Sequence, residues 1–169
     1  MAYTSSQVVQ AVPTGINSAL VFISSTTLSG SSTVISNCFS ATYDSYYATF
    51  SNLPALSVNV RLSLGAGTNH TYNLRSIQPA GSDSNLVTGT NQNFFTISTL
   101  DNVCNGIIQF VSPFLGCPTF VNAQSSNGNQ FMIFQGNETS STSFTSMTFT
   151  APASTWTGGV VKIYGYTTS

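Results

Sequence analysis

The sequence predicts an all-β protein, an antiparallel β-sandwich of about 8 to 11 short strands. Three observations predict this class. Apolar and polar residues alternate with period two along most of the chain, and clusters of Gly, Asn, Ser and Pro separate the alternating segments. The strong helix formers Glu, Lys and Arg are nearly absent, and no window places apolar residues at i, i+3, i+4 and i+7. We therefore expect almost no helix.

The clearest strand covers residues 58–64, where Val58, Val60, Leu62 and Leu64 alternate with polar residues. Such a segment buries one face and exposes the other. The same criteria predict eleven strands in order along the chain, at residues 19–27, 33–39, 46–53, 58–64, 71–78, 94–99, 106–113, 119–124, 130–135, 143–150 and 160–166. Most aromatic residues fall inside these segments, and we expect them to fill the space between two sheets.

Turn residues lie between the predicted strands, for example Gly65-Ala66-Gly67 and Gly158-Gly159. Asn127-Gly128 is typical of a hairpin turn. The chain length and the number of strands suit an eight-stranded jelly roll with a few edge additions.

The chain is long enough for one domain, and no composition shift or linker divides it. We predict a single sandwich over residues 16–169. Residues 1–15 lack a strand pattern, so we expect either an arm that lies across a neighbouring subunit or a frayed terminus. The start has no signal-peptide pattern and no segment approaches 20 apolar residues, so we expect a soluble protein made in a cytoplasm.

Only seven of the 169 residues are charged, whereas 73 are Ser, Thr, Asn or Gln. A typical soluble domain carries about 25% charged residues. The net charge of −1 offers no basic surface for a phosphate backbone, which argues against a nucleic-acid partner. The three cysteines are widely spaced and form no CxxC pair, which predicts buried free thiols and no zinc site. A disulfide between Cys104 and Cys117 is the alternative in an oxidising compartment.

Catalytic groups are scarce, and we expect no enzyme. His70 is the sole histidine, and the sequence has no Gly-x-Ser-x-Gly motif whose serine it could activate as a base. We expect His70 at the surface. The four acids are expected in turns, without a carboxylate pair for glycoside hydrolysis: Asp44, Asp83, Asp101 and Glu138. Residues 81–85 contain a single acid and give only a weak candidate for a cation site, so we expect no metal and no other cofactor.

The remaining cations are expected on strands, with Arg75 and Lys162 facing outward and Arg61 paired with an acid or a neighbouring subunit. Two Asn-x-Thr sequons, at Asn69 and Asn137, have meaning only in a chain secreted by a eukaryote.

Three stretches in this order resemble structural proteins of tailed bacteriophages, and the resemblance extends over most of the chain. The first is residues 19–28 followed by residues 34–47, which contain the pattern Phe-Ser-x-x-Tyr-Asp-x-Tyr at residues 39–46. The second is residues 107–114. The third is residues 157–166, similar to a closing Gly-x-Val-x-Ile-Tyr-Gly strand.

The resemblance implies a jelly-roll-like sandwich on the virion, commonly a homotrimer, with no catalytic residues. It implies either a decoration (cement) protein that binds the major capsid protein on the outer surface of the head, or the tip of a tail fibre. The short arm before the sandwich favours the decoration protein. For docking we expect, from the arm and from loops, the residues Tyr3, Val8, Val9, Val12, Tyr43, Tyr46 and Tyr47.

The alternative is a receptor-binding module that recognises a host surface glycan with loop residues. Trp156 and Asn127 are the candidates for that role, because Trp156 lies among Ser and Thr in a predicted loop and offers a ring for stacking. A Trp that closes one end of the sandwich is the simpler explanation for the same sequence. No membrane partner is expected in either case.

Overall fold

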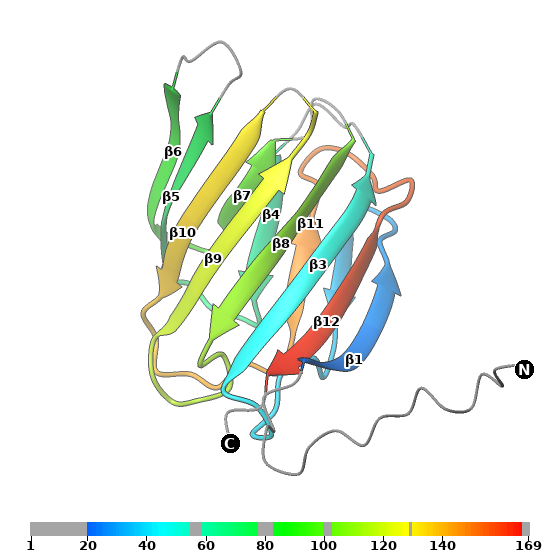
Figure 1. Cartoon of the computed structure of the whole chain (residues 1–169). Helices are drawn as coiled ribbons and strands as arrows, with labels where there is room; N and C mark the ends of the chain where they lie inside the picture. The colour runs from blue at the N-terminus through cyan, green and yellow to red at the C-terminus, as the bar shows by residue number, and fades with distance from the viewer. Residues whose placement is uncertain (1–19, 55–58, 78–82, 100–102, 129, 167–169) are drawn as a thin grey trace, which may run out of the picture.

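The computed structural model describes residues 20–54, 59–77, 83–99, 103–128 and 130–166. In these residues the chain forms twelve strands in two antiparallel sheets and no helix, which confirms the predicted all-β sandwich (Figure 1). The two sheets differ in size and lie face to face, with the larger one in front in Figure 1.

The large sheet has eight strands, in the spatial order β1 (Leu20–Thr27), β12 (Val160–Tyr166), β3 (Ser45–Leu53), β8 (Cys104–Val111), β9 (Thr119–Ser126), β10 (Phe131–Glu138), β5 (His70–Ile77) and β6 (Asp83–Gln92). The small sheet has four strands, in the order β2 (Ser32–Ile35), β11 (Met147–Thr150), β4 (Asn59–Leu64) and β7 (Phe95–Thr99).

Eight strands form a nested framework, because β1 pairs with β12, β2 with β11, β3 with β8 and β4 with β7. The other four strands are two inserted hairpins. The β5–β6 hairpin lies between β4 and β7 in the chain, and β9–β10 lies between β8 and β11. Since β9 pairs with β8 and β10 pairs with β5, the two hairpins extend the large sheet on one side of the framework.

All eleven predicted strands are present within a few residues of the expected bounds, but β6 was not predicted. Its sequence, residues 83–92, is rich in Ser, Asn, Thr and Gly and has little apolar alternation. It lies at the edge of the large sheet and pairs only with β5. Hydrogen bonds between the two backbones hold such an edge strand, so a strong side-chain pattern is not required.

The core between the sheets is rich in aromatic rings. Phe50, Phe95, Phe110, Phe134 and Phe149 are fully buried and most make edge-to-face contacts, for example Phe95 with Phe134 at 5.4 Å between ring centroids. Such contacts stabilise a core beyond the area that they bury. The expectation that aromatic residues of the predicted strands fill the core was wrong for Phe22, Phe120 and Phe131, which are 56%, 57% and 41% exposed.

The three cysteines are free thiols, with Cys38 and Cys104 buried as predicted and Cys117 half-buried. The alternative disulfide between Cys104 and Cys117 is therefore not formed. Burial raises the pKa of the Cys38 thiol to about 12, so this side chain stays protonated and unreactive at neutral pH.

Candidate functional site

The most concentrated polar group in the interior joins His70 and Glu138. His70 begins β5, Glu138 ends β10, and the two residues are direct partners across these antiparallel strands. Both side chains are completely buried. The expectations of a surface histidine and of a glutamate in a turn were therefore wrong, because the pairing of two distant segments places both side chains on the inner face.

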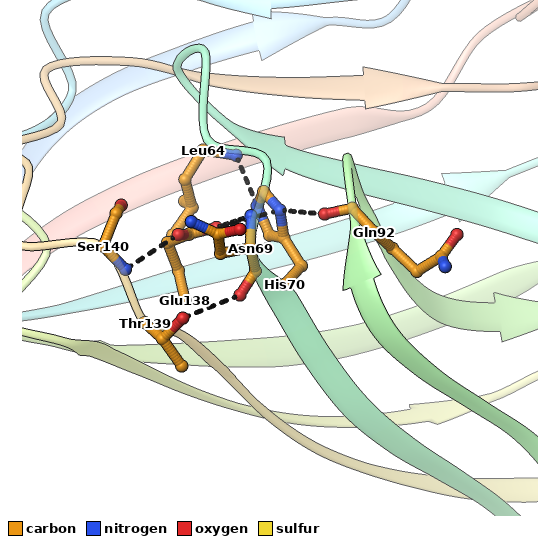
Figure 2. A network of polar contacts seen from close by, with 7 residues as sticks. All are labelled: Leu64, Asn69, His70, Gln92, Glu138, Thr139 and Ser140. Carbon is orange, nitrogen blue, oxygen red and sulfur yellow. Dashed lines mark hydrogen bonds and ion pairs between the residues drawn. The ribbon is translucent and has the colours of Figure 1, made fainter.

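The hydrogen bonds of His70 define its protonation. Its Nδ1 atom lies 3.0 Å from Oε2 of Glu138 and 2.9 Å from the carbonyl oxygen of Gln92, while the backbone N–H of Leu64 donates to Nε2 at 3.4 Å (Figure 2). Two acceptors face Nδ1 and one donor faces Nε2. The ring is therefore a neutral imidazole with its proton on Nδ1.

Glu138 accepts hydrogen bonds with both carboxylate oxygens. Besides His70, the backbone N–H of Asn69 donates to Oε2 at 3.2 Å and the backbone N–H of Ser140 donates to Oε1 at 3.0 Å. The backbone N–H of Thr139 donates to the carbonyl oxygen of Asn69 at 3.3 Å. The carboxylate thus ties the start of β5 to the segment that leaves β10.

This arrangement suits a structural role better than a catalytic one. A histidine acts as a general base through a free ring nitrogen, but both nitrogens of His70 are in hydrogen bonds and the ring packs edge-on against Phe95 at 4.3 Å. We assign the group the role of a clamp that joins β4, β5, β10 and the end of β6.

Burial lowers the pKa of His70 below its ordinary value of 6.5, against the opposing effects of the Gln92 carbonyl and the Glu138 carboxylate. The unfolded chain therefore takes up a proton near pH 6.5 that the folded chain does not, and the free energy of unfolding falls as the pH drops below 6.5. Urea titrations from pH 8 to pH 5 should show a plateau above about pH 7 and then this decline. Because His70 is the sole histidine, His70→Gln should flatten the curve between pH 7 and 6. An unchanged curve in the variant would assign the decline to other groups.

The two residues predicted for glycan recognition are not exposed, and that prediction was wrong. Trp156 is 4% exposed, and its backbone N–H donates to the carbonyl oxygen of Gly30 at 2.7 Å. It is buried in the core, in agreement with the simpler explanation. Asn127 is 2% exposed, and its side-chain oxygen accepts a hydrogen bond from the backbone N–H of Gln130 at 2.9 Å, within the predicted hairpin turn between β9 and β10.

The tyrosines predicted for docking separate into different environments. Tyr46 lies inside β3 and is completely buried, with its hydroxyl group bonded to the backbone N–H and carbonyl of Ser40, both at 2.7 Å. The prediction that Tyr46 is an exposed loop residue that contacts a partner was wrong. Tyr43 is half-buried against Gly165, and Tyr47 is half-buried on the outer face of β3. The predicted arm, with Tyr3, Val8, Val9 and Val12, lies outside the described residues.

The other charged candidates are dispersed. Asp44 is exposed before β3, Asp83 begins β6 rather than a turn, and Asp101 lies outside the described residues. Arg61 stacks over the ring of Phe94, with its guanidinium carbon 4.0 Å from the ring centroid. Within the described ranges, no three His, Cys, Asp or Glu side chains gather in a group that could hold a metal ion. Residues 81–85, the weak cation candidate, are only partly described.

The sequence analysis missed a surface pocket on the outer face of the large sheet. It has a volume of about 570 Å³ and lies over β5, β6, β9 and β10. Polar side chains line it, including Asn73, Asn122, Gln135 and Asn137, together with the exposed ring of Phe120. Three of these amides, Asn73, Asn122 and Gln135, occupy outward positions of predicted strands. Their proximity depends on the strand order, which the sequence pattern does not contain.

Comparison of the chain with protein-family models finds no match, and comparison with curated proteins finds none either. Among the described residues there is no helix that is long and apolar enough to cross a membrane.

Proposed function

We propose that the chain is a non-enzymatic structural protein of a tailed-bacteriophage virion. Its role would be that of a decoration protein that binds the major capsid protein on the outside of the head and stabilises the shell. Its nested strand pairs support a jelly-roll topology, in which an eight-stranded hairpin folds into two sheets. The observation that carries the proposal is an uncovered apolar strand at the sandwich edge.

The strand in question is β1, the first strand of the large sheet. Leu20, Val21 and Phe22 are 56%, 39% and 56% exposed, so apolar side chains are uncovered on both faces of the strand. One backbone edge of β1 has no partner among the described strands. Proteins normally protect such edges with charge, proline or a cover, because an exposed apolar edge pairs readily with another chain. The edge of β1 therefore has the character of an interface.

The two edges of the large sheet differ, which supports a directed contact. Opposite β1, the edge strand β6 exposes Thr88 and Thr90. Val34, on the edge strand β2 of the small sheet, is 58% exposed and is a second uncharged apolar side chain on an edge strand. A protein that docks by one edge of its sandwich exposes the rest of its surface to solvent.

The energetics of a cement protein fit this surface. Burial of apolar area contributes about 25 cal/mol per Å², part of which is lost to the entropy of docking. Many copies on one shell make modest individual contacts sufficient. Because the chain has few charges, salt has little ion pairing to screen at this interface. Self-association as a homotrimer is part of the proposal, since repeated identical subunits favour symmetric contacts.

The first test is cryo-electron microscopy of virions that contain this chain. We expect many copies of the sandwich over the head lattice, with β1 directed toward capsid subunits or toward a second copy. A few copies at the tail would overturn the decoration role and favour the second role, a tail-fibre tip that binds a host receptor.

A variant pair tests the edge itself. Phe22→Asp places a charge on β1, whereas Thr90→Asp places the same charge on the opposite edge. Sedimentation of each purified protein, alone and with particles stripped of it, measures self-association and capsid binding. We expect Phe22→Asp to lose binding and Thr90→Asp to bind like the parent protein. Equal binding by both variants would contradict a role for the β1 edge.

A further inference from the structure

Four amide side chains form a row across the outer face of the large sheet. Asn122 of β9 pairs in register with Gln109 of β8 on one side and with Gln135 of β10 on the other. Gln135 pairs in turn with Asn73 of β5. Adjacent strands lie about 4.8 Å apart, so the row extends about 14 Å across the sheet. Asn73, Asn122 and Gln135 are exposed and Gln109 is half-buried. All four side chains point away from the core, since their neighbours along each strand point into it.

The hydrogen-bonding capacity of this row is not used within the part of the chain that the structure describes. None of the four amide groups takes part in a side-chain hydrogen bond there, whereas the amides of Asn105, Asn127 and Gln130 are each engaged by a neighbour. Each free amide offers two donors and one acceptor oxygen. The row can therefore bind a ligand that presents donors and acceptors close together.

The surface over the row is hollow where the inserted hairpins meet. The pocket of about 570 Å³ includes Asn73, Asn122 and Gln135 together with Asn137, Thr88 and Phe120. Its volume lies within the range of small-molecule sites. Phe120 is 57% exposed and is the register partner of Asn137, so its ring stands beside the amides at one side of the pocket.

The floor of the pocket is closely packed. Gly136 lies under it, and a side chain there would collide with the buried rings of Phe134 and Phe95. Tyr72 of β5 is buried beneath the same surface and its hydroxyl group bonds to Thr96 of β7 at 3.1 Å. A packed floor fixes the backbone positions from which the outward side chains project, and thereby the spacing of these side chains.

The chemistry of the lining identifies the class of ligand. None of the described residues that line the pocket is charged, so this lining offers no counter-charge to an ionic ligand. Amide and hydroxyl groups match the adjacent hydroxyl groups of a sugar, which both donate and accept hydrogen bonds. An exposed aromatic ring offers an apolar plane for the C–H face of a sugar ring. We propose that the outer face of the large sheet over β5, β6, β9 and β10 binds a neutral glycan, through the amides of Asn73, Asn122 and Gln135 and the ring of Phe120.

Affinity electrophoresis of the purified chain tests this proposal. The gels contain, in turn, the neutral polysaccharides dextran, mannan, galactomannan and laminarin, and the anionic polysaccharides alginate and heparin. We expect retardation in at least one neutral gel and no retardation in the anionic gels. Titration calorimetry with the retarding polysaccharide then gives the dissociation constant of each variant.

Two variants remove the proposed contacts, and two matched variants serve as controls. Phe120→Ala and the double variant Asn122→Ala with Gln135→Ala should weaken binding about tenfold or more. Phe131→Ala removes another exposed Phe of this face and Gln124→Ala another exposed amide of β9, and neither residue lines the pocket. Both controls should bind within about twofold of the parent protein. All these positions point to solvent, and circular dichroism of each variant confirms that it is folded.

Three results would overturn the proposal: no retardation by any neutral polysaccharide, preferential binding of alginate or heparin, or unchanged binding by both pocket variants. The proposal does not depend on the location of the chain on a virion. Its failure would leave docking by β1 intact, and a failure of β1 docking would leave the pocket test unaffected.

Discussion

Glu138→Ala is expected to lower the free energy of unfolding by about 2 to 4 kcal/mol. The substitution removes the acceptor of three hydrogen bonds, donated by Nδ1 of His70 and by the backbone N–H groups of Asn69 and Ser140. Nδ1 of His70 keeps the carbonyl oxygen of Gln92 as an acceptor, but the N–H groups of Asn69 and Ser140 lose their acceptor at partly buried positions and are left with an unfavourable desolvation cost. Urea unfolding followed by the fluorescence of Trp156, the sole tryptophan, measures the loss.

Two further variants make this prediction specific to the carboxylate. Glu138→Gln keeps the shape and one acceptor oxygen but turns an NH₂ group toward a backbone donor, so its cost should be about 1 to 3 kcal/mol. Thr139→Ala alters the exposed neighbour and should cost less than about 1 kcal/mol. If Glu138→Ala unfolds at the same urea concentration as the parent protein, the cost of burying the carboxylate cancels its hydrogen bonds, and the clamp does not stabilise the fold.

Phe95→Ala is expected to cost about 3 to 5 kcal/mol and to loosen the inserted hairpins more than the framework. Phe95 belongs to β7 of the small sheet, is completely buried, and contacts rings from both hairpins. Its centroid lies 4.3 Å from that of His70, 6.2 Å from that of Tyr72 and 5.4 Å from that of Phe134. Removal of this ring leaves a cavity directly beneath the strands that form the pocket.

Hydrogen exchange with mass spectrometry distinguishes a local effect from a global one. In Phe95→Ala we expect faster exchange in β5, β6 and β10 at urea concentrations where β3 and β12 stay protected. Phe110→Ala is the matched control, because Phe110 is equally buried but lies in β8 and contacts Phe39 at 5.2 Å. It should cost a similar amount and increase exchange in the framework. The same exchange pattern in both variants would show that the sandwich unfolds as one unit and that the hairpins have no separate stability.

The all-β class and eleven of the strands could be predicted because the signal is local. In residues 58–64, alternation alone identifies the buried face, and Val60, Leu62 and Leu64 are indeed completely buried. The Asn127-Gly128 turn was equally local, since Gly128 adopts a φ of +85° that favours glycine. The strand β6 escaped prediction because its position at an edge, and not its own composition, makes it a strand.

The candidate sites depended on contacts between distant segments, and there the predictions were less successful. Charged and polar residues generally lie at the surface, and the sequence around His70 and Glu138 gives no sign of an exception. The pairing of β5 with β10 nevertheless buries both side chains. Trp156 and Asn127 occur among turn residues, yet Trp156 belongs to the core and pairs with the distant Gly30, and Asn127 is bonded within its own turn.

By itself, the sequence determined the shortage of charge, the period of the eleven predicted strands and the outward or inward direction of most of their side chains, because strand period and direction depend on neighbours within a few residues. Tertiary structure alone decided which strands lie side by side. That order places the amides of Gln109, Asn122, Gln135 and Asn73 in one row and puts β1 at one edge of the large sheet. The physical reason is that pairing between strands depends on backbone hydrogen bonds and on packing of the whole core, and neither is encoded in the pattern of any single strand.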